Sequence, residues 1–416
     1  MFQTIQLNNG VRIIFEKMPS MRSAAVGIFV SVGSRFESAA ENGSAHFIEH
    51  MLFKRTHNHS TEELSYIIDG IGGQINAYTT RESTCFYAKV LDAHLDTAID
   101  LLCEMFFDCA FDGEETQSER GVILEEIGMY EDTPDDACYE KLMSGCFKGA
   151  LGRPVLGKAA TLQKMDGESL RAFKNKHYTA GNIVISVCGS FEESHVEKLA
   201  NAFAVLDKSK QKLSKQATYT QHISVKKKKT EQNQLCLAFP SLSLSNEARF
   251  SMNLLSTILG GGVSSRLFQN IREKHGLCYS IYSFQSGFSD TGLFSVATAV
   301  SSDTEMKALG LIADEIRRLT QEGVSQEELS RAREQAKSSL VMGLESTSSR
   351  MLKLGNALLS LGKNMNTDEI LQRYDSVTAE EVLELAQSTM DFSKLSISAL
   401  GKTAAPEEYL KALGVS

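Results

Sequence analysis

Two histidines and a glutamate within one short stretch, His46-Phe47-Ile48-Glu49-His50, could carry out metal-assisted hydrolysis. Helical positions four residues apart lie about 40° apart around the axis and one turn above each other, so both imidazoles could bind one metal ion. Glu49 lies on the same face, three residues after His46. A hydrolytic zinc site needs two neutral nitrogen ligands and a carboxylate that accepts a proton from water. The order H-x-x-E-H reverses the zinc-binding pattern H-E-x-x-H.

A third ligand must come from elsewhere in the chain, because a catalytic zinc takes three protein ligands and leaves one position for water. The segment 119–127 has helical composition. Glu119 and Glu126 are seven residues apart and project from one face of that helix, whereas Glu125 points about 100° away. From spacing alone, such a pair of acids is also typical of a solvated helix face. Likewise, two histidines on an amphipathic helix could simply be satisfied by hydrogen-bond partners.

The elements that position these residues belong to a chain of 416 residues, which suits two domains of about 200 residues each. With 42% hydrophobic and 23% charged residues, the composition is that of an ordinary globular protein. The net charge of −9 argues against nucleic acid as a partner and allows basic substrates. Because there is no apolar stretch of about 20 residues and no signal-peptide pattern at residues 1–7, we expect a cytoplasmic protein without a membrane partner.

The eight cysteines include no C-x-x-C pair. In a chain of this length we expect them to be reduced and mostly buried, as small hydrophobic residues. A disulfide framework is therefore not expected, which agrees with a cytoplasmic location.

A polar, lysine-rich stretch between Leu206 and Gln234 interrupts the apolar patterning. We therefore predict an N-terminal zinc-binding catalytic domain at 1–207, a linker and first strand region at 208–234, and a C-terminal homologous domain without the metal site at 235–416. The lysines at 226–229 could form a patch for polyanions, but they are more typical of a solvated linker or a protected edge strand.

The two halves of the chain resemble each other in the order of their expected strands and helices. The helix that begins near Phe111 has a counterpart near Val324, an offset of 324 − 111 = 213 residues. At that offset Glu119 corresponds to Ala332, and the second half contains no H-x-x-E-H. This pattern predicts a duplicated α+β unit in which only the first copy has a metal site.

Three stretches carry a resemblance that spans essentially the whole chain: residues 43–54, 119–126 and 260–268. By these stretches the chain resembles the insulinase–pitrilysin superfamily of zinc peptidases, the inverzincins. It looks most like the short bacterial members similar to the β subunit of the mitochondrial processing peptidase. In that family the third ligand lies about 76 residues beyond the second histidine, and 126 − 50 = 76. The resemblance therefore implies that Glu126 is the ligand and that Glu119 supports the site by orienting a histidine.

The resemblance also implies residues that hold the substrate. Asn76 and Ala77 lie on the expected edge strand beside the metal and would contact the backbone of an extended peptide, although they could equally belong to an ordinary sheet strand. Arg266 and Tyr279 match an arginine–tyrosine pair that donates to a substrate carbonyl or its oxyanion from the second domain.

We therefore expect an α+β fold of two homologous domains, each a mostly antiparallel sheet packed with helices, that forms half of a clamshell. The expected activity is that of a zinc metalloendopeptidase with one Zn²⁺ per chain, held by His46, His50 and Glu126. It would cleave unfolded peptides or presequence-like segments in extended conformation, with Glu49 activating the water. Because the chain carries both the metal motif and the arginine–tyrosine pair, a homodimer is expected. The alternative is a non-catalytic subunit that binds peptides or serves assembly.

Overall fold

The computed structural model describes residues 1–415, which form two compact units. Unit 1 comprises residues 1–127, 153–215 and 342–364, and unit 2 comprises residues 128–152, 216–341 and those from 365 onward. Each unit therefore includes a short segment from the other half of the chain. The linear division at 207 and 234 remains a prediction.

The sheet of unit 1 has six strands in the order β1-β2-β6-β3-β5-β4. Adjacent strands in this sheet are antiparallel, except for β2 and β6, which are parallel. The strands are β1 (Gln3–Gln6), β2 (Arg12–Lys17), β3 (Ser23–Val30), β4 (Gln74–Thr79), β5 (Thr84–Leu91) and β6 (Ile183–Gly189). β4 is an edge strand that pairs only with β5, with Asn76 opposite Tyr87 and Ala77 opposite Phe86.

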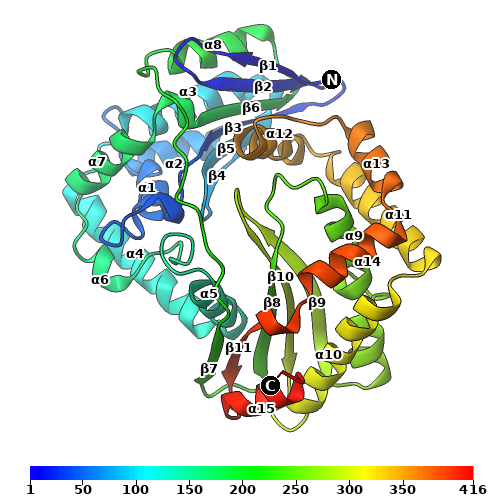
Figure 1. Cartoon of the computed structure of the whole chain (residues 1–416). Coiled ribbons are helices and arrows are strands. Elements are labelled where there is room, and N and C mark those ends of the chain that lie inside the picture. The colour runs from blue at the N-terminus through cyan, green and yellow to red at the C-terminus, as the bar shows by residue number, and fades with distance from the viewer. Residues whose placement is uncertain (416) are drawn as a thin grey trace. The chain divides into compact units, whose positions relative to one another are not determined.

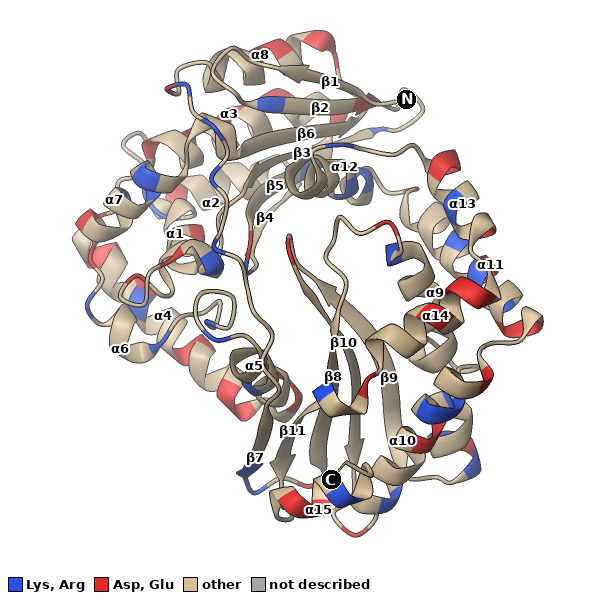
Figure 2. Ribbon diagram, in the orientation of Figure 1, with Lys and Arg blue, Asp and Glu red and all other residues tan. Residues whose placement is uncertain are grey.

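Both faces of the central strands in unit 1 are buried. In β3, Val26, Ile28 and Val30 contribute to the larger core, and Ala25 and Phe29 point to the opposite face, as the period of two requires. That opposite face is covered by α12 (Thr347–Leu361), as Figure 1 shows. Neither β3 nor β6 carries a charged residue (Figure 2), as expected for strands with two dry faces.

The larger core of unit 1 lies between the other face of the sheet and several helices. They include α1 (Ser44–Leu52), α3 (Leu95–Asp108), α4 (Gly113–Asp132), α7 (Gly167–His177) and α8 (Glu193–Phe203). α1 contributes Phe47, Ile48 and Met51, all fully buried, so one face of this helix is fixed in the core. α1 also packs against the edge strand β4. The smaller elements of the unit are η1 (Ser34–Phe36), α2 (Thr61–Gly70), η2 (Asp92–His94), α6 (Ala159–Leu162) and η3 (Ala180–Asn182).

The sheet of unit 2 has five strands in the order β7-β11-β8-β10-β9, of which only β7 and β11 are parallel. The strands are β7 (Ile223–Lys227), β8 (Asn233–Ser241), β9 (Cys278–Gly287), β10 (Gly292–Val300) and β11 (Ser396–Gly401). One face packs against α5 (Pro134–Cys146). The other contributes to a core with helices that include α9 (Arg249–Gly260), α10 (Glu305–Glu322) and α14 (Ala379–Thr389).

The remaining elements of the second half are η4 (Phe268–Lys274, a π-helix), α11 (Gln326–Gly343), α13 (Thr367–Ser376), η5 (Phe392–Lys394) and α15 (Pro406–Ala412). None of the helices in the described part of the chain is both long and apolar enough to cross a membrane. All eight cysteines are free, and six of them are buried.

The predicted α+β class with two mostly antiparallel, helix-packed sheets is confirmed. The strand orders β2-β6-β3-β5-β4 and β7-β11-β8-β10-β9 correspond, as a duplication requires. Each sheet also takes one covering helix from the other half of the chain: α12 packs on the sheet of unit 1, and α5 on that of unit 2.

Candidate metal centre

The two histidines of the first motif lie on α1, one turn apart, as their spacing predicts. Their rings are arranged edge to face with centroids 4.6 Å apart. His46 is buried, and the side chain of His50 is 21% exposed. Because Phe47, Ile48 and Met51 anchor the opposite side of α1 in the core, the helix cannot rotate to turn the imidazoles away.

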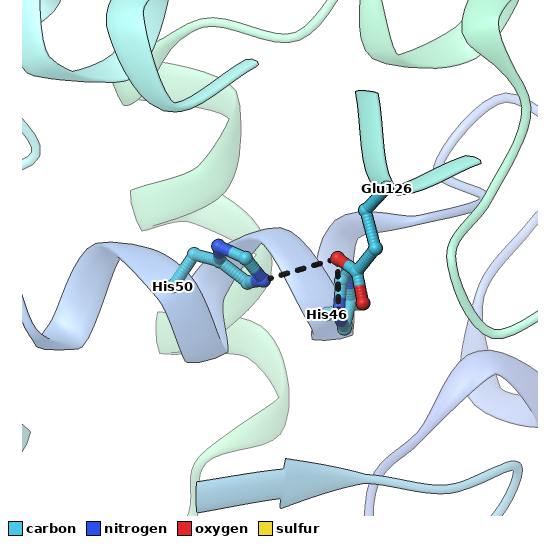
Figure 3. A group of neighbouring side chains, drawn as sticks. All are labelled: His46, His50 and Glu126. Atoms are coloured by element: carbon cyan, nitrogen blue, oxygen red, sulfur yellow. Dashed lines mark ion pairs between the residues drawn. The ribbon is translucent and has the colours of Figure 1, made fainter. Parts of the chain in front are cut away.

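The carboxylate of Glu126, on α4, completes the group. Its Oε2 lies 3.6 Å from Nε2 of His46 and 3.6 Å from Nε2 of His50. One ligand atom of each residue lies within 4.8 Å of the other two. Figure 3 shows the three side chains converging on a common point.

These distances suit a shared metal ion better than direct hydrogen bonds. A nitrogen–oxygen hydrogen bond measures about 2.7–3.2 Å, which is shorter than either separation. Ligands about 2.0–2.1 Å from a tetrahedral zinc are about 3.3–3.4 Å apart, which is close to the observed 3.6 Å. Two imidazole nitrogens and one carboxylate oxygen are also a common ligand set of catalytic zinc sites. The residues therefore fit Zn²⁺.

The electrostatics of the group favour a cation. Burial opposes the charge of His50, yet the carboxylates of Glu119 and Glu126 outweigh it and raise the pKa of this histidine to about 9. Burial and the neighbouring charge of His50 lower the pKa of His46 to about 4, so that this imidazole is neutral. Without a metal, His50 therefore carries a positive charge beside the carboxylates of Glu119 and Glu126. A divalent cation would supply positive charge at the same place.

A second layer of contacts orients His50. Oε1 of Glu119 lies 2.8 Å from Nδ1 of His50, and Nζ of Lys54 lies 2.7 Å from Oε2 of the same carboxylate. An Nδ1–H that donates to Glu119 leaves Nε2 free as the metal-binding nitrogen. Nδ1 of His46, by contrast, is buried without a hydrogen-bond partner among the described residues.

Glu49 lies on α1 between the two histidines in the sequence, and the charges of His50 and Glu126 act on its carboxyl. Burial raises the pKa of its carboxyl, although the charge of His50 and a hydrogen bond from Thr79 act in the opposite direction. The hydroxyl of Thr79 donates to Oε2 of Glu49, so the last residue of β4 contacts the expected base.

Asn76 and Ala77 lie on the edge strand β4, where the sequence predicts them. The side chain of Asn76 is exposed, and its Oδ1 accepts the backbone N–H of Ala77 at 2.8 Å. Since α1 packs against this strand, both residues lie on the element next to the helix that carries both histidines.

In unit 2 the structure places Arg266 and Tyr279 in different environments. Arg266 donates through Nε and Nη2 to the two carboxylate oxygens of Glu328, at 2.7 and 2.9 Å, and also to the carbonyl oxygen of Gly323. Tyr279 is 80% exposed on β9, and the guanidinium carbon of Arg272 lies 5.2 Å from the centre of its ring. The expected role of Arg266 as a donor to the substrate remains a prediction, and two nitrogens of its guanidinium already bind Glu328.

Sequence reasoning missed three residues that contact the candidate site residues. They are Lys54, which binds Glu119, Thr79, which binds Glu49, and Arg272, which lies over the ring of Tyr279. Lys54 lies in the stretch 43–54, two residues beyond the end of α1, and Thr79 is the last residue of β4. For Lys54 the spacing of four residues from His50 is a weak local signal, because α1 ends at Leu52, two residues before it. For Thr79 no local signal existed, since its partner is 30 residues away in the chain.

Comparison with protein families places the three candidate metal ligands in a matched region. The family described as "Insulinase (Peptidase family M16)" matches residues 12–159, which contain His46, His50 and Glu126. The description "Peptidase M16 inactive domain" matches residues 164–336, which lack the H-x-x-E-H motif.

Similar sequences extend over nearly the whole chain. The protein of Bacillus subtilis named "Uncharacterized zinc protease YmxG" is 39% identical over 406 residues, which cover 96% of this chain and 99% of the relative. A protein of Rickettsia felis named "Uncharacterized zinc protease" is 35% identical over 402 residues and covers 96% and 97% of the two chains.

Solved structures share the fold. The peptidase M16 inactive domain from Pseudomonas fluorescens superposes with a TM-score of 0.90 at 21% identity and covers 97% of this chain and 99% of its own. A protease from Helicobacter pylori gives a TM-score of 0.88 at 20% identity, with coverage of 96% and 99%. At these identities the likeness concerns the fold.

Proposed function

The chain belongs to the insulinase family of peptidases, Peptidase family M16, and from this premise we propose that it is a zinc metalloendopeptidase for unfolded peptides or presequence-like segments. The observation that supports the proposal most is the group formed by His46, His50 and Glu126, with three ligand atoms within 4.8 Å. Glu49 adds a carboxylate on the same helix face, and its pKa is raised by burial.

In the proposed reaction His46, His50 and Glu126 hold the zinc, and Glu49 is the general base. When bound, Zn²⁺ supplies Lewis acidity that lowers the pKa of water toward about 7 and polarises a carbonyl. Glu49 accepts a proton from the attacking water and passes it to the amine that leaves when the peptide bond breaks. Thr79 holds the Glu49 carboxylate in place through its hydroxyl. Glu119 fixes the proton of His50 on Nδ1.

The substrate would bind as an additional strand on β4. An edge strand has unpaired N–H and C=O groups, so it can capture an extended peptide through its backbone while tolerating many side chains. Asn76 and Ala77 are the residues of β4 that we assign to this contact. Peptides with N-methylated amides near the cleaved bond should therefore be poorer substrates than their unmodified counterparts.

From unit 2 we assign the phenol of Tyr279 as a donor to the substrate. We keep Arg266 as its partner in the proposal and add the neighbouring guanidinium of Arg272 as a second candidate, because Arg266 already binds Glu328 through two nitrogens. We retain the homodimer as part of the proposal. Sedimentation of the purified protein at micromolar concentration as a single chain would contradict it.

The test of the proposed function is cleavage of a quenched fluorescent peptide library by the purified protein. Turnover should disappear on chelation and return when Zn²⁺ is restored, and the products would reveal the preferred bonds. Absence of turnover by protein verified to contain one zinc per chain would favour the alternative, a non-catalytic subunit that binds peptides or serves assembly.

A further inference from the structure

The helix that carries both histidines begins without a cap of its own. The residue before α1 is Gly43, in a left-handed conformation with φ of 104° and with no side chain to accept hydrogen bonds. A Cβ added there would lie 2.8 Å from Cδ2 of Leu162 and 3.0 Å from Cα of Gly157. Serine or aspartate, the usual capping residues, would therefore be strained and crowded at this position. The free N–H groups of the first turn need an acceptor from elsewhere.

The buried carboxylate of Glu37 supplies that acceptor. Its Oε2 accepts the backbone N–H of Gly43 at 2.9 Å, and its Oε1 accepts the N–H of Ala45 at 2.8 Å. Nδ2 of Asn42 donates to Oε2 as well, at 2.8 Å. Glu37 is only 3% exposed, so these donors replace water. A negative charge at the N-terminus of a helix is also favoured by the helix dipole.

Glu37 is itself held by a fixed segment. The preceding residues of η1 bind the turn between β4 and β5: Arg35 N–H donates to the carbonyl oxygen of Arg81 at 2.8 Å, and its Nη1 donates to Glu82 at 2.6 Å. Nη1 of Arg153 donates to the carbonyl oxygen of Glu37. The carboxylate that caps α1 is thus anchored to the turn that follows the edge strand β4.

The cap matters most for His46, the third residue of α1. His50 has Glu119 to orient its ring, but Nδ1 of His46 has no partner in the described part of the chain. The direction of the His46 imidazole therefore depends on the packing around it and on the backbone of the first helical turn. Ala45, whose N–H binds Glu37, immediately precedes His46 in that turn.

We propose that Glu37 is a positioning residue for the metal centre, which fixes the first turn of α1 and through it the direction of Nε2 of His46. This inference rests on the proposed zinc site. A glutamine at this position would place an NH₂ group among donors, because Asn42, Gly43 and Ala45 all donate to the carboxylate. Burial raises the pKa of Glu37 to about 7, although the hydrogen bonds from Asn42, Ala45 and Gly43 act in the opposite direction.

The experiment compares Glu37→Gln with the control Glu41→Gln, a partly exposed acid of the same loop that contacts Ser38 and Lys176. Zinc dissociation constants are measured by chelator competition, and the absorption spectrum of the Co²⁺-substituted protein reports the ligand geometry. Glu37→Gln should weaken zinc binding at least about tenfold and change the Co²⁺ spectrum, whereas Glu41→Gln should resemble the wild type. Thermal unfolding of the metal-free proteins separates this effect from general destabilisation.

If Glu37→Gln does not fold, Asn42→Ala takes its place, since it removes one donor that orients the carboxylate, and it should weaken zinc binding several-fold. Unchanged zinc affinity and an unchanged Co²⁺ spectrum in the folded variant would overturn the inference, as would equal losses in Glu37→Gln and the control. Wild-type protein that binds no zinc would instead refute the proposed function, and the inference with it.

Discussion

Oε1 of Glu119 lies 2.8 Å from Nδ1 of His50, and this contact determines which nitrogen of the imidazole faces Glu126. Lys54 binds the other oxygen of Glu119 at 2.7 Å, so the carboxylate cannot readily turn away. The side chain of Glu119 is 8% exposed, which shields both contacts from water. In the proposed zinc site, this arrangement fixes the tautomer of His50 that leaves Nε2 available to the metal.

Glu119→Gln should weaken zinc binding by about 10- to 100-fold, because the amide is neutral and holds the Nδ1 proton of His50 less firmly. Competition with a chelator of known affinity measures the change. Glu125→Gln is the matched control, since Glu125 lies on the same helix but is exposed. Equal zinc affinity of the two variants would exclude Glu119 from the support of the site.

Glu49→Gln should abolish most turnover and leave zinc bound. Glutamine has the shape of glutamate but cannot accept the proton from water, and loss of a general base typically lowers kcat about 10²- to 10⁴-fold. Zinc content by atomic spectroscopy and kcat on a fluorescent peptide would be measured on the same preparation. Retained turnover would remove Glu49 from the mechanism, whereas loss of zinc would make it a structural residue of the site.

Thr79→Val should lower kcat about tenfold with little effect on zinc affinity, because a hydrogen bond to a charged group contributes about 1.5–3 kcal/mol and the variant removes only that bond from Glu49. Thr79→Ser keeps the hydroxyl and should retain most activity. If valine and serine behave alike in steady-state kinetics, the hydroxyl has no role in orienting the base.

The local part of the site could be predicted because it depends on helix geometry alone. His46, Glu49 and His50 lie in one helix, and their spacing places them on one face whatever surrounds that helix. The alternation of apolar residues likewise predicts buried strands such as β3. The position of Glu126 near the histidines followed only from the family resemblance, since its spacing fits a solvated helix face as well.

Contacts between distant segments could not be predicted, because no local pattern specifies them. Arg266 meets Glu328, 62 residues away, and Glu37 caps a helix whose own N-terminal residue is a glycine. The packing of α12 on the sheet of unit 1 could not be predicted either. Its composition indicates an amphipathic helix but not which sheet it covers.

The ion pair of Arg266 and Glu328 leads to a prediction about stability and pH. Hydrogen bonds from Arg266 hold the pKa of Glu328 at about 2, below its ordinary value of 4.5. Since the pKa is lowered in the folded state, the pair stabilises the protein fully above about pH 4.5, and this contribution is lost as the pH falls toward about 2. Glu328→Gln should therefore lower the free energy of unfolding by up to about 3 kcal/mol at pH 7.

The difference between wild type and Glu328→Gln should shrink as the pH falls from 4.5 toward 2, which urea denaturation at a series of pH values would measure. Glu327→Gln is the control, because the side chain of Glu327 is 83% exposed and its pair with Arg331 contributes little. A difference that stays constant down to pH 3 would mean that Arg266 does not stabilise the charged form of Glu328.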